Sequence, residues 1–277
     1  MLNKKYMALT VTLALSYAAS ASAMDENIKW NGFISAVAAI NDTKTTYLED
    51  VDENIGVRDY RLGLSMSKKL GEGWNVAALL IAHEGEEQIV LHWGFVDIQL
   101  NDNINLSLGK QKFMNSVVSE YYHVGYAYPW IRPPQEFYSI QSLGPNMSID
   151  AINGASMTLR TTSADIEYKL QPFFGISDLP SESGQLKKVA GVKMSAGTEA
   201  FTMQAAYFQG MLKIPESPDR SHVTGETIKT WTLGSTLNWE NIIGYFEYGQ
   251  SSISEYSEFD TNAGYVTLGY KFMPERF

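Results

Sequence analysis

The stretch Thr230-Trp-Thr-Leu-Gly-Ser-Thr-Leu-Asn-Trp239 alternates apolar and polar side chains almost residue by residue. Successive side chains of an extended strand point to opposite faces of a sheet, so this stretch forms one apolar and one polar face. The apolar face carries Trp231 and Trp239 at its two ends. Aromatic side chains at the ends of an apolar strand face are typical of strands that cross a membrane, where they lie near the lipid headgroups.

The same alternation recurs about twelve times, with breaks rich in Gly, Asp, Asn, Ser and Pro. Clear examples are 164–174, 201–207 and 266–272. The polar faces carry charges such as Glu167 and Lys169, which need water, and the lumen of a barrel supplies it. The pattern therefore predicts an all-β fold: a transmembrane, antiparallel, up-and-down β-barrel of about twelve strands.

The lengths of the predicted connections support this architecture. Five are short, at 71–73, 101–103, 161–163, 196–198 and 238–241, and five are longer, at 42–56, 114–147, 178–185, 215–227 and 251–262. Short turns at one end and long loops at the other are typical of outer-membrane barrels. A secreted β-sandwich also has alternating strands, but it explains neither the one-sided loops nor the aromatic residues at strand ends.

The first 23 residues have the layout of a secretory signal peptide. Lys4 and Lys5 precede an apolar segment, Tyr6 to Ala19, and the small residues Ala21-Ser22-Ala23 follow it. The apolar segment is shorter than the roughly twenty residues that a membrane-spanning helix needs. We therefore expect cleavage after Ala23, export to the cell outer membrane, and a mature barrel formed by residues 24–277.

The composition excludes several functions. The formal charge of −10 argues against nucleic acid as a partner, and the absence of cysteine excludes disulfides and thiolate chemistry. The mean hydropathy of −0.18 is too low for a helical membrane protein and suits a barrel, in which only alternate strand residues face lipid. No spacing of His, Asp or Glu resembles a metal site, and no phosphate-binding glycine motif is present, so we expect no cofactor.

The longest predicted connection, Met114 to Met147, is too aromatic for a disordered loop. It also contains Pro129, Pro133 and Pro134, which stiffen the backbone. Its aromatic residues are Tyr121, Tyr122, Tyr126, Tyr128, Trp130, Phe137 and Tyr138. Because such a segment packs rather than stays in solvent, we expect it to fold into the lumen and narrow the pore.

Three segments carry a resemblance to a known family. Leu108-Gly-Lys-Gln-Lys-Phe113, Val124-Gly-Tyr-Ala-Tyr-Pro-Trp-Ile-Arg-Pro-Pro-Gln-Glu-Phe-Tyr138 and Asn153-Gly-Ala-Ser156 resemble porin-like outer-membrane proteins of Gram-negative bacteria, in the general porin superfamily. The resemblance implies a channel with an inward-folded third loop, and, because such porins are often trimers, a homotrimer. The chain is short for a sixteen-stranded porin, so it is either a complete twelve-stranded barrel or a truncated member; Pro274, close to the end, favours truncation.

Selectivity in a pore comes from charges placed around its constriction. In porins, basic side chains on the wall face acidic side chains on the inward loop. The alternation places Arg61, Arg160 and Lys193 on the lumen face, and the loop contributes Glu120, Glu136 and Arg132. Each of these could be only a solvated lumen charge, and Arg132 could instead tie the loop to wall carboxylates.

Lys110 stands where the resemblance places a porin arginine. Strict alternation puts it on the lipid face with Leu106 and Leu108, at a cost of about 2–4 kcal/mol near the bilayer midplane. A bulge at Gly109 that turns Lys110 inward is one solution, and a position high enough for its side chain to reach the interface is the other. We expect the bulge.

The sequence therefore predicts a passive channel for small hydrophilic solutes, in contact with outer-membrane lipid and lipopolysaccharide, and not an enzyme. A surface receptor or adhesin is the alternative, with its function in the acidic connections 42–56 or 251–262, which could also bind divalent cations that bridge lipopolysaccharide. An outer-membrane lipid hydrolase is the less favoured alternative. His83 and His92 fall on adjacent predicted strands, but neither has a serine motif nearby.

Overall fold

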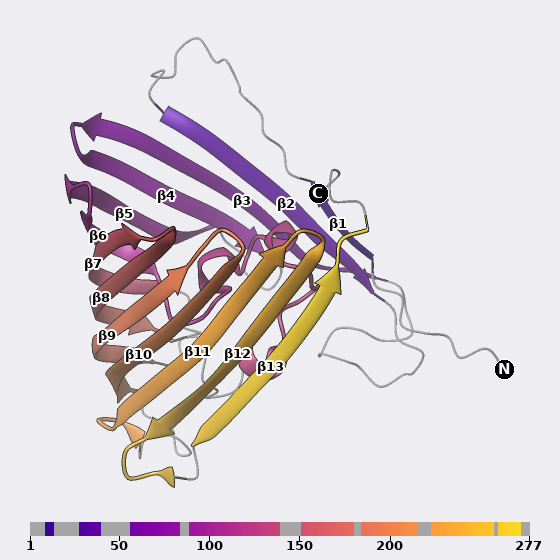
Figure 1. Cartoon of the computed structure of the whole chain (residues 1–277). Coiled ribbons are helices and arrows are strands. Elements are labelled where there is room, and N and C mark those ends of the chain that lie inside the picture. The colour runs from indigo at the N-terminus through magenta and orange to yellow at the C-terminus, as the bar shows by residue number, and fades with distance from the viewer. Residues whose placement is uncertain are drawn as a thin grey trace.

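The computed structural model describes residues 9–13, 28–39, 56–83, 89–138, 151–179, 184–214, 223–257 and 260–272. In this part of the chain a single 13-stranded antiparallel sheet follows the chain order, so that each strand pairs with the strands before and after it. The sheet curls round, and residues 113–138, which follow β6, lie inside the curve (Figure 1). The predicted all-β, up-and-down barrel fold is confirmed.

The strands are β1 (Leu9–Leu13), β2 (Ile28–Ala39), β3 (Gly56–Gly71), β4 (Trp74–His83), β5 (Val90–Asn101), β6 (Ile104–Lys112), β7 (Ala151–Ser163), β8 (Ile166–Asp178), β9 (Gln185–Gly197), β10 (Phe201–Lys213), β11 (Thr227–Trp239), β12 (Ile242–Ile253) and β13 (Thr261–Tyr270). Three short helical turns, η1 (Ser119–Tyr121), η2 (Gly125–Ala127) and α1 (Gln135–Tyr138), lie between β6 and β7. None of the helices in the described ranges is long and apolar enough to cross a membrane.

Strand β1 lies within the predicted signal peptide and pairs with β2, from Leu9 opposite Ala38 to Leu13 opposite Ile34. The twelve strands β2 to β13 all follow the predicted cleavage point. The remainder of the predicted signal peptide and residues 273–277 lie outside the described residues. Within the described ranges, β13 is hydrogen-bonded to β12 alone and forms one edge of the sheet.

The connections divide the barrel into two ends, named here from their lengths. The short-turn end carries the turns 72–73, 102–103, 164–165, 198–200 and 240–241, and the long-connection end carries the other connections between β2 and β13. The outer face is apolar, as the alternation predicts: Met203 is 58 % exposed, Leu268 75 % and Val266 69 %. These side chains lie where lipid would contact a membrane barrel.

The inner face is less polar than the alternation predicts. At the long-connection end, Phe113, which follows β6, forms one cluster with buried apolar side chains from β7 to β12, among them Phe173, Phe208 and Ile228. Connection residues Leu179 and Val223 belong to the same cluster. The interior here is therefore a packed core beneath the connections, and a water-filled path would run elsewhere in the barrel.

Candidate constriction site

The segment from Phe113 to Tyr138, called the inward loop below, crosses the interior of the barrel. Its Glu120 contacts Lys193 of β9, and its Trp130 donates a hydrogen bond to Thr267 Oγ1 of β13 over 3.0 Å. On the opposite wall, Arg61 of β3 donates to the carbonyl oxygen of Tyr122 over 3.3 Å. The prediction that this segment folds inward is confirmed for residues 114–138, and residues 139–147 lie outside the described residues.

A buried carboxylate anchors the inward loop to β12. Glu247 is fully buried, and its Oε1 accepts a hydrogen bond from the backbone N–H of Val117 over 2.6 Å. Its Oε2 accepts hydrogen bonds from the hydroxyl of Tyr138 and, over 2.6 Å, from that of Tyr265. Buried charges persist where several hydrogen bonds satisfy them, and here two of the three donors belong to the loop.

The Tyr138 hydroxyl keeps its proton in this anchor. Burial, and then the negative charge of Glu247, raise the pKa of Tyr138 well above its ordinary value. A protonated hydroxyl can donate to the carboxylate, whereas a phenolate would repel it. Tyr138 therefore remains a hydrogen-bond donor across the neutral and moderately alkaline range.

A glycine on β11 provides the space in which the loop docks. A Cβ atom at Gly234 would lie 2.6 Å from Cγ2 of Val117 and 3.3 Å from the carbonyl oxygen of Phe246. Thr232, on the same inner face of β11, donates a hydrogen bond to the carbonyl oxygen of Asn115. Gly234 thus lets the loop backbone approach the wall closely.

We expect Gly234→Val to displace the loop without altering any charge, because the new side chain would occupy the place of Val117. Amide hydrogen exchange of the loop peptide 113–122 should accelerate by at least about tenfold, and exchange of β11 should stay unchanged. Ser235→Val, on the outer face of the same strand, is the matched control. Unchanged exchange of the loop in Gly234→Val would contradict the docked arrangement.

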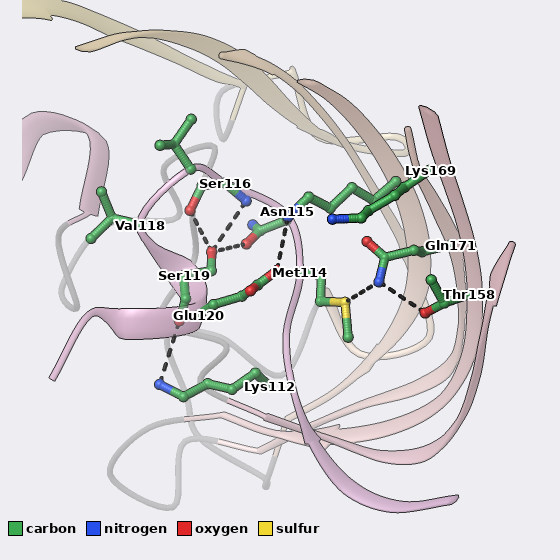
Figure 2. A network of polar contacts seen from close by, with 12 residues as sticks. Lys112, Met114, Asn115, Ser116, Val118, Ser119, Glu120, Thr158, Lys169 and Gln171 are labelled. Atoms are coloured by element: carbon green, nitrogen blue, oxygen red, sulfur yellow. Dashed lines mark hydrogen bonds and ion pairs between the residues drawn. The ribbon is translucent and has the colours of Figure 1, made fainter. Parts of the chain in front are cut away.

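The charges of the site lie around the first helical turn of the loop. Glu120 Oε1 lies 3.1 Å from Nζ of Lys193, which is only 6 % exposed. Lys112 donates a hydrogen bond to the carbonyl oxygen of Ser119 over 3.4 Å, and Lys169 of β8 lies within electrostatic range of Glu120. Figure 2 shows these two lysines on either side of the loop residues Asn115, Ser116, Ser119 and Glu120. One acidic loop residue therefore faces three wall cations.

The attraction of Lys193 holds the pKa of the Glu120 carboxyl below its usual range, and Lys169 and Lys112 act in the same direction. Burial opposes this effect but does not overcome it. Because the pKa is lowered on folding, the ion pair stabilises the docked loop above the unfolded-state pKa of about 4.3, and this contribution is lost as the pH falls through the lower folded value.

We therefore expect the contribution of Glu120 to ion selectivity to stay constant from pH 7 to about 5 and to disappear only below about pH 4. The measurement is the reversal potential under a salt gradient for the natural chain and for Glu120→Gln at each pH. The difference between the two proteins isolates the contribution of Glu120 from that of the other titratable groups. A difference that vanished near pH 6 would contradict the proximity of Lys193.

The structure places the other predicted site residues apart from this cluster. The guanidinium of Arg61 lies 5.6 Å above the ring of Tyr122 and ties the loop to β3. Arg160 is exposed at the short-turn end, where it lines a cavity of about 720 Å³ with Lys69, Asp97 and Asn105. Arg132 lies half-buried in the loop after Trp130, and the backbone of Glu136 lies in α1 while its side chain lies outside the described part of the chain.

The predicted bulge at Gly109 is absent, and Lys110 faces outward. Residues 104–112 of β6 pair with β7 without a register shift, and Lys110 lies opposite Gly94 of β5. The same cross-strand row continues through Ala78 and Met66 on the exposed outer face. The ammonium group of Lys110 donates a hydrogen bond to the carbonyl oxygen of Leu91 over 2.7 Å. The side chain thus reaches toward the long-connection end, where its charge finds a polar partner.

Sequence reasoning missed the anchor and two of the three cations. Alternation placed Lys169 on the polar face with Glu167, but it gave Lys169 no role in the site. Glu247 lies two residues after the inward Tyr245, so the same alternation could have placed it on the inner face. Lys112 ends β6, where the strand passes into the loop. What alternation could not show is which inward residues the loop reaches.

Three histidines also come together at the loop. The ring of His123 lies 4.3 Å from that of His92 on β5 and 6.4 Å from that of His83 on β4, centroid to centroid. His92 and His123 are buried beside the apolar cluster of Phe33, Leu79 and Ile81, against which Val124 packs. Among the described residues, no group of His, Asp or Glu has the geometry to hold a metal ion.

Comparison with known proteins gives similarity to solved structures only. No family model matches the chain, and a search of curated proteins found no match. The chain is similar to OmpT, an outer membrane protein of Vibrio cholerae in a trimer form, with a TM-score of 0.43 and 10 % identity over 96 % of this chain and 84 % of that one. It is also similar to Salmonella typhi OmpF in complex with daunomycin, with a TM-score of 0.44 and 9 % identity over 88 % and 86 %. These likenesses are too weak to assign a function.

Proposed function

We propose that this protein is an outer-membrane channel through which small hydrophilic solutes diffuse passively. One observation supports this proposal best: inside a barrel with an apolar exterior, Glu120 on the inward loop faces three lysines of the wall, Lys193, Lys169 and Lys112. Opposed charges inside a lumen create a transverse field, which sorts solutes by charge while the loop limits their size. No bond is made or broken in this function.

The proposal includes the assembly and surroundings of the protein. The signal peptide delivers the chain to the outer membrane, where its exterior contacts lipid and lipopolysaccharide, and three copies assemble as a homotrimer. A trimer would give an unheated electrophoretic band of about three times the monomer mass that collapses on boiling. A band at the monomer mass before boiling would remove the trimer from the proposal and leave the channel.

Liposome swelling tests the channel directly. Protein purified from outer membranes of cells that express the full chain is placed in liposomes, and the swelling rate is measured in isosmotic sugars of increasing size. We expect fast swelling in a pentose and a steep fall towards a tetrasaccharide, because the inward loop fills part of the interior. Absence of swelling in the smallest sugar would overturn the proposal.

A non-conducting barrel with its function in the outer connections is the second candidate. Contacts of the inward loop with widely separated strands, at Arg61 of β3 and at Lys193 of β9, favour it. If the natural chain does not swell liposomes but Gly234→Val does, the barrel is plugged by its loop. In that case a surface-binding role replaces passive transport.

A further inference from the structure

Four lysines gather at the long-connection end of β9, β10 and β11. Lys187 lies opposite Met211, and Lys213, two residues beyond Met211, lies opposite Gln185. Lys229 of β11 lies opposite Gln209 of β10. Lys188 follows Lys187 directly, so one short stretch of three neighbouring strands carries all four ammonium groups.

These lysines project from the outer face of the barrel. On β10, Lys213 is an even number of residues from the exposed Met203 and Tyr207, so all three point to the same face. On β11, Lys229 shares a face with the exposed Leu233 for the same reason. The register between β9 and β10 shifts here, and Lys188 takes the left-handed conformation with φ 51°. The flanking Leu186 and Val189 are fully buried on the inner face, so this bulge presents both Lys187 and Lys188 outward.

The group, called the lysine rim below, carries excess positive charge. Within the described part of the chain, none of the four lysines forms an ion pair with a carboxylate. Lys187 and Lys213 lie close enough to repel each other. The carboxylate at the end of β8, Asp178, accepts a hydrogen bond from Gln185 over 2.8 Å. Four neighbouring lysines, none of them ion-paired among the described residues, in a chain of net charge −10, indicate an anionic partner.

The height of the lysine rim identifies the kind of partner. From Phe201 at the short-turn end to Met211, the outward side chains of β10 are mainly apolar. Ten residues at a rise of about 3.3 Å and a tilt of about 45° cover roughly 23 Å, close to the apolar band of about 25 Å in such barrels. Lys213 and Lys187 therefore lie just beyond the hydrocarbon region, at the level of the headgroups.

We propose that Lys187, Lys188, Lys213 and Lys229 form a binding site for the phosphate groups of lipopolysaccharide. The proposal rests on the proposed outer-membrane location, in which the long-connection end faces outside and is surrounded by this phosphorylated glycolipid. Lysine binds phosphate as a flexible point charge, and several lysines at one level can engage the separate phosphates of one headgroup. The apolar outward residues below the rim would contact its acyl chains.

The test measures binding of lipid A by the purified, delipidated protein in detergent, followed by native mass spectrometry. The probes are bisphosphorylated lipid A, its dephosphorylated form, phosphatidylglycerol and inorganic phosphate. The test variant is Lys187→Gln/Lys213→Gln/Lys229→Gln, and the charge-retaining variant has arginine at the same positions. Lys68→Gln, an outward lysine at the short-turn end, is the matched control.

We expect the glutamine variant to lose affinity for bisphosphorylated lipid A by about fivefold per lysine removed. The arginine variant and Lys68→Gln should bind as the natural chain does, which excludes misfolding as the cause. Equal binding by the glutamine variant would overturn the proposal, as would equal affinity of the natural chain for phosphatidylglycerol or dephosphorylated lipid A. Full displacement of lipid A by millimolar inorganic phosphate would indicate a simple anion site instead. Lipid A binding without liposome swelling would leave this site standing and remove only the channel.

Discussion

Glu247→Ala will release the inward loop from the barrel wall. The substitution leaves three donors without their acceptor: the Val117 amide and the hydroxyls of Tyr138 and Tyr265. At about 1 kcal/mol or more for each unsatisfied donor, the docked loop should lose on the order of 3 kcal/mol. That corresponds to more than a hundredfold increase in the undocked population, which hydrogen exchange of peptide 113–122 will report.

Two further variants separate the anchor from general instability of the barrel. Glu247→Gln keeps an acceptor for Val117 and should accelerate exchange far less than alanine does. Asp97→Ala removes an inward carboxylate near the short-turn end, where it accepts hydrogen bonds from Asn105 over 2.6 Å and from Ser107 over 2.7 Å. If Glu247→Ala and Asp97→Ala accelerate exchange of the loop equally, Glu247 is not the anchor.

The second large effect is expected from Glu120→Lys. This change adds a fourth cation to Lys193, Lys169 and Lys112, and it removes the acidic loop residue that faces them. The substitution changes the charge at this position by two units. Each unit contributes about 1 kcal/mol to the interaction with a solute ion that passes near 4 Å in a water-like medium, so the change favours anions strongly. After screening by salt, we expect the anion-to-cation permeability ratio to rise roughly tenfold.

The swapped pair tests whether the geometry of the cluster matters in addition to its charge. Glu120→Lys/Lys193→Glu restores the ion pair in the opposite direction and should return the permeability ratio most of the way to that of the natural chain. Glu199→Lys, at the exposed turn between β9 and β10, makes the same charge change away from the loop. A shift in Glu199→Lys as large as that in Glu120→Lys would show that net charge alone sets selectivity.

Strand pattern was predictable from the sequence because alternation is a local property. Trp231, Leu233 and Trp239 share a face in any extended strand, and the twelve strands β2 to β13 follow from such stretches. The inward course of the loop was predictable from its aromatic content. Its docking partners were not, since Glu247 lies 130 positions from Val117 and only the curled sheet brings them together.

The predicted pore charges illustrate the same limit. Lys193 and Glu120 were both identified, one by strand parity and one by position in the loop, but nothing in the sequence pairs them. Lys110 was expected to turn inward because lipid disfavours charge, yet a long side chain near the strand end reaches a carbonyl oxygen instead. The apolar inner cluster around Phe208 was missed because alternation was taken to mean a polar lumen.

Single-channel recording in a planar bilayer under a salt gradient tests the central claim most directly. With protein purified from outer membranes, we predict stable ohmic steps whose reversal potential shifts in opposite directions for Glu120→Lys and Lys193→Gln/Lys169→Gln. Steps with an identical reversal potential in all three proteins would show that the loop and wall charges do not line the path. A bilayer that remains silent at protein levels giving insertion would contradict the channel itself.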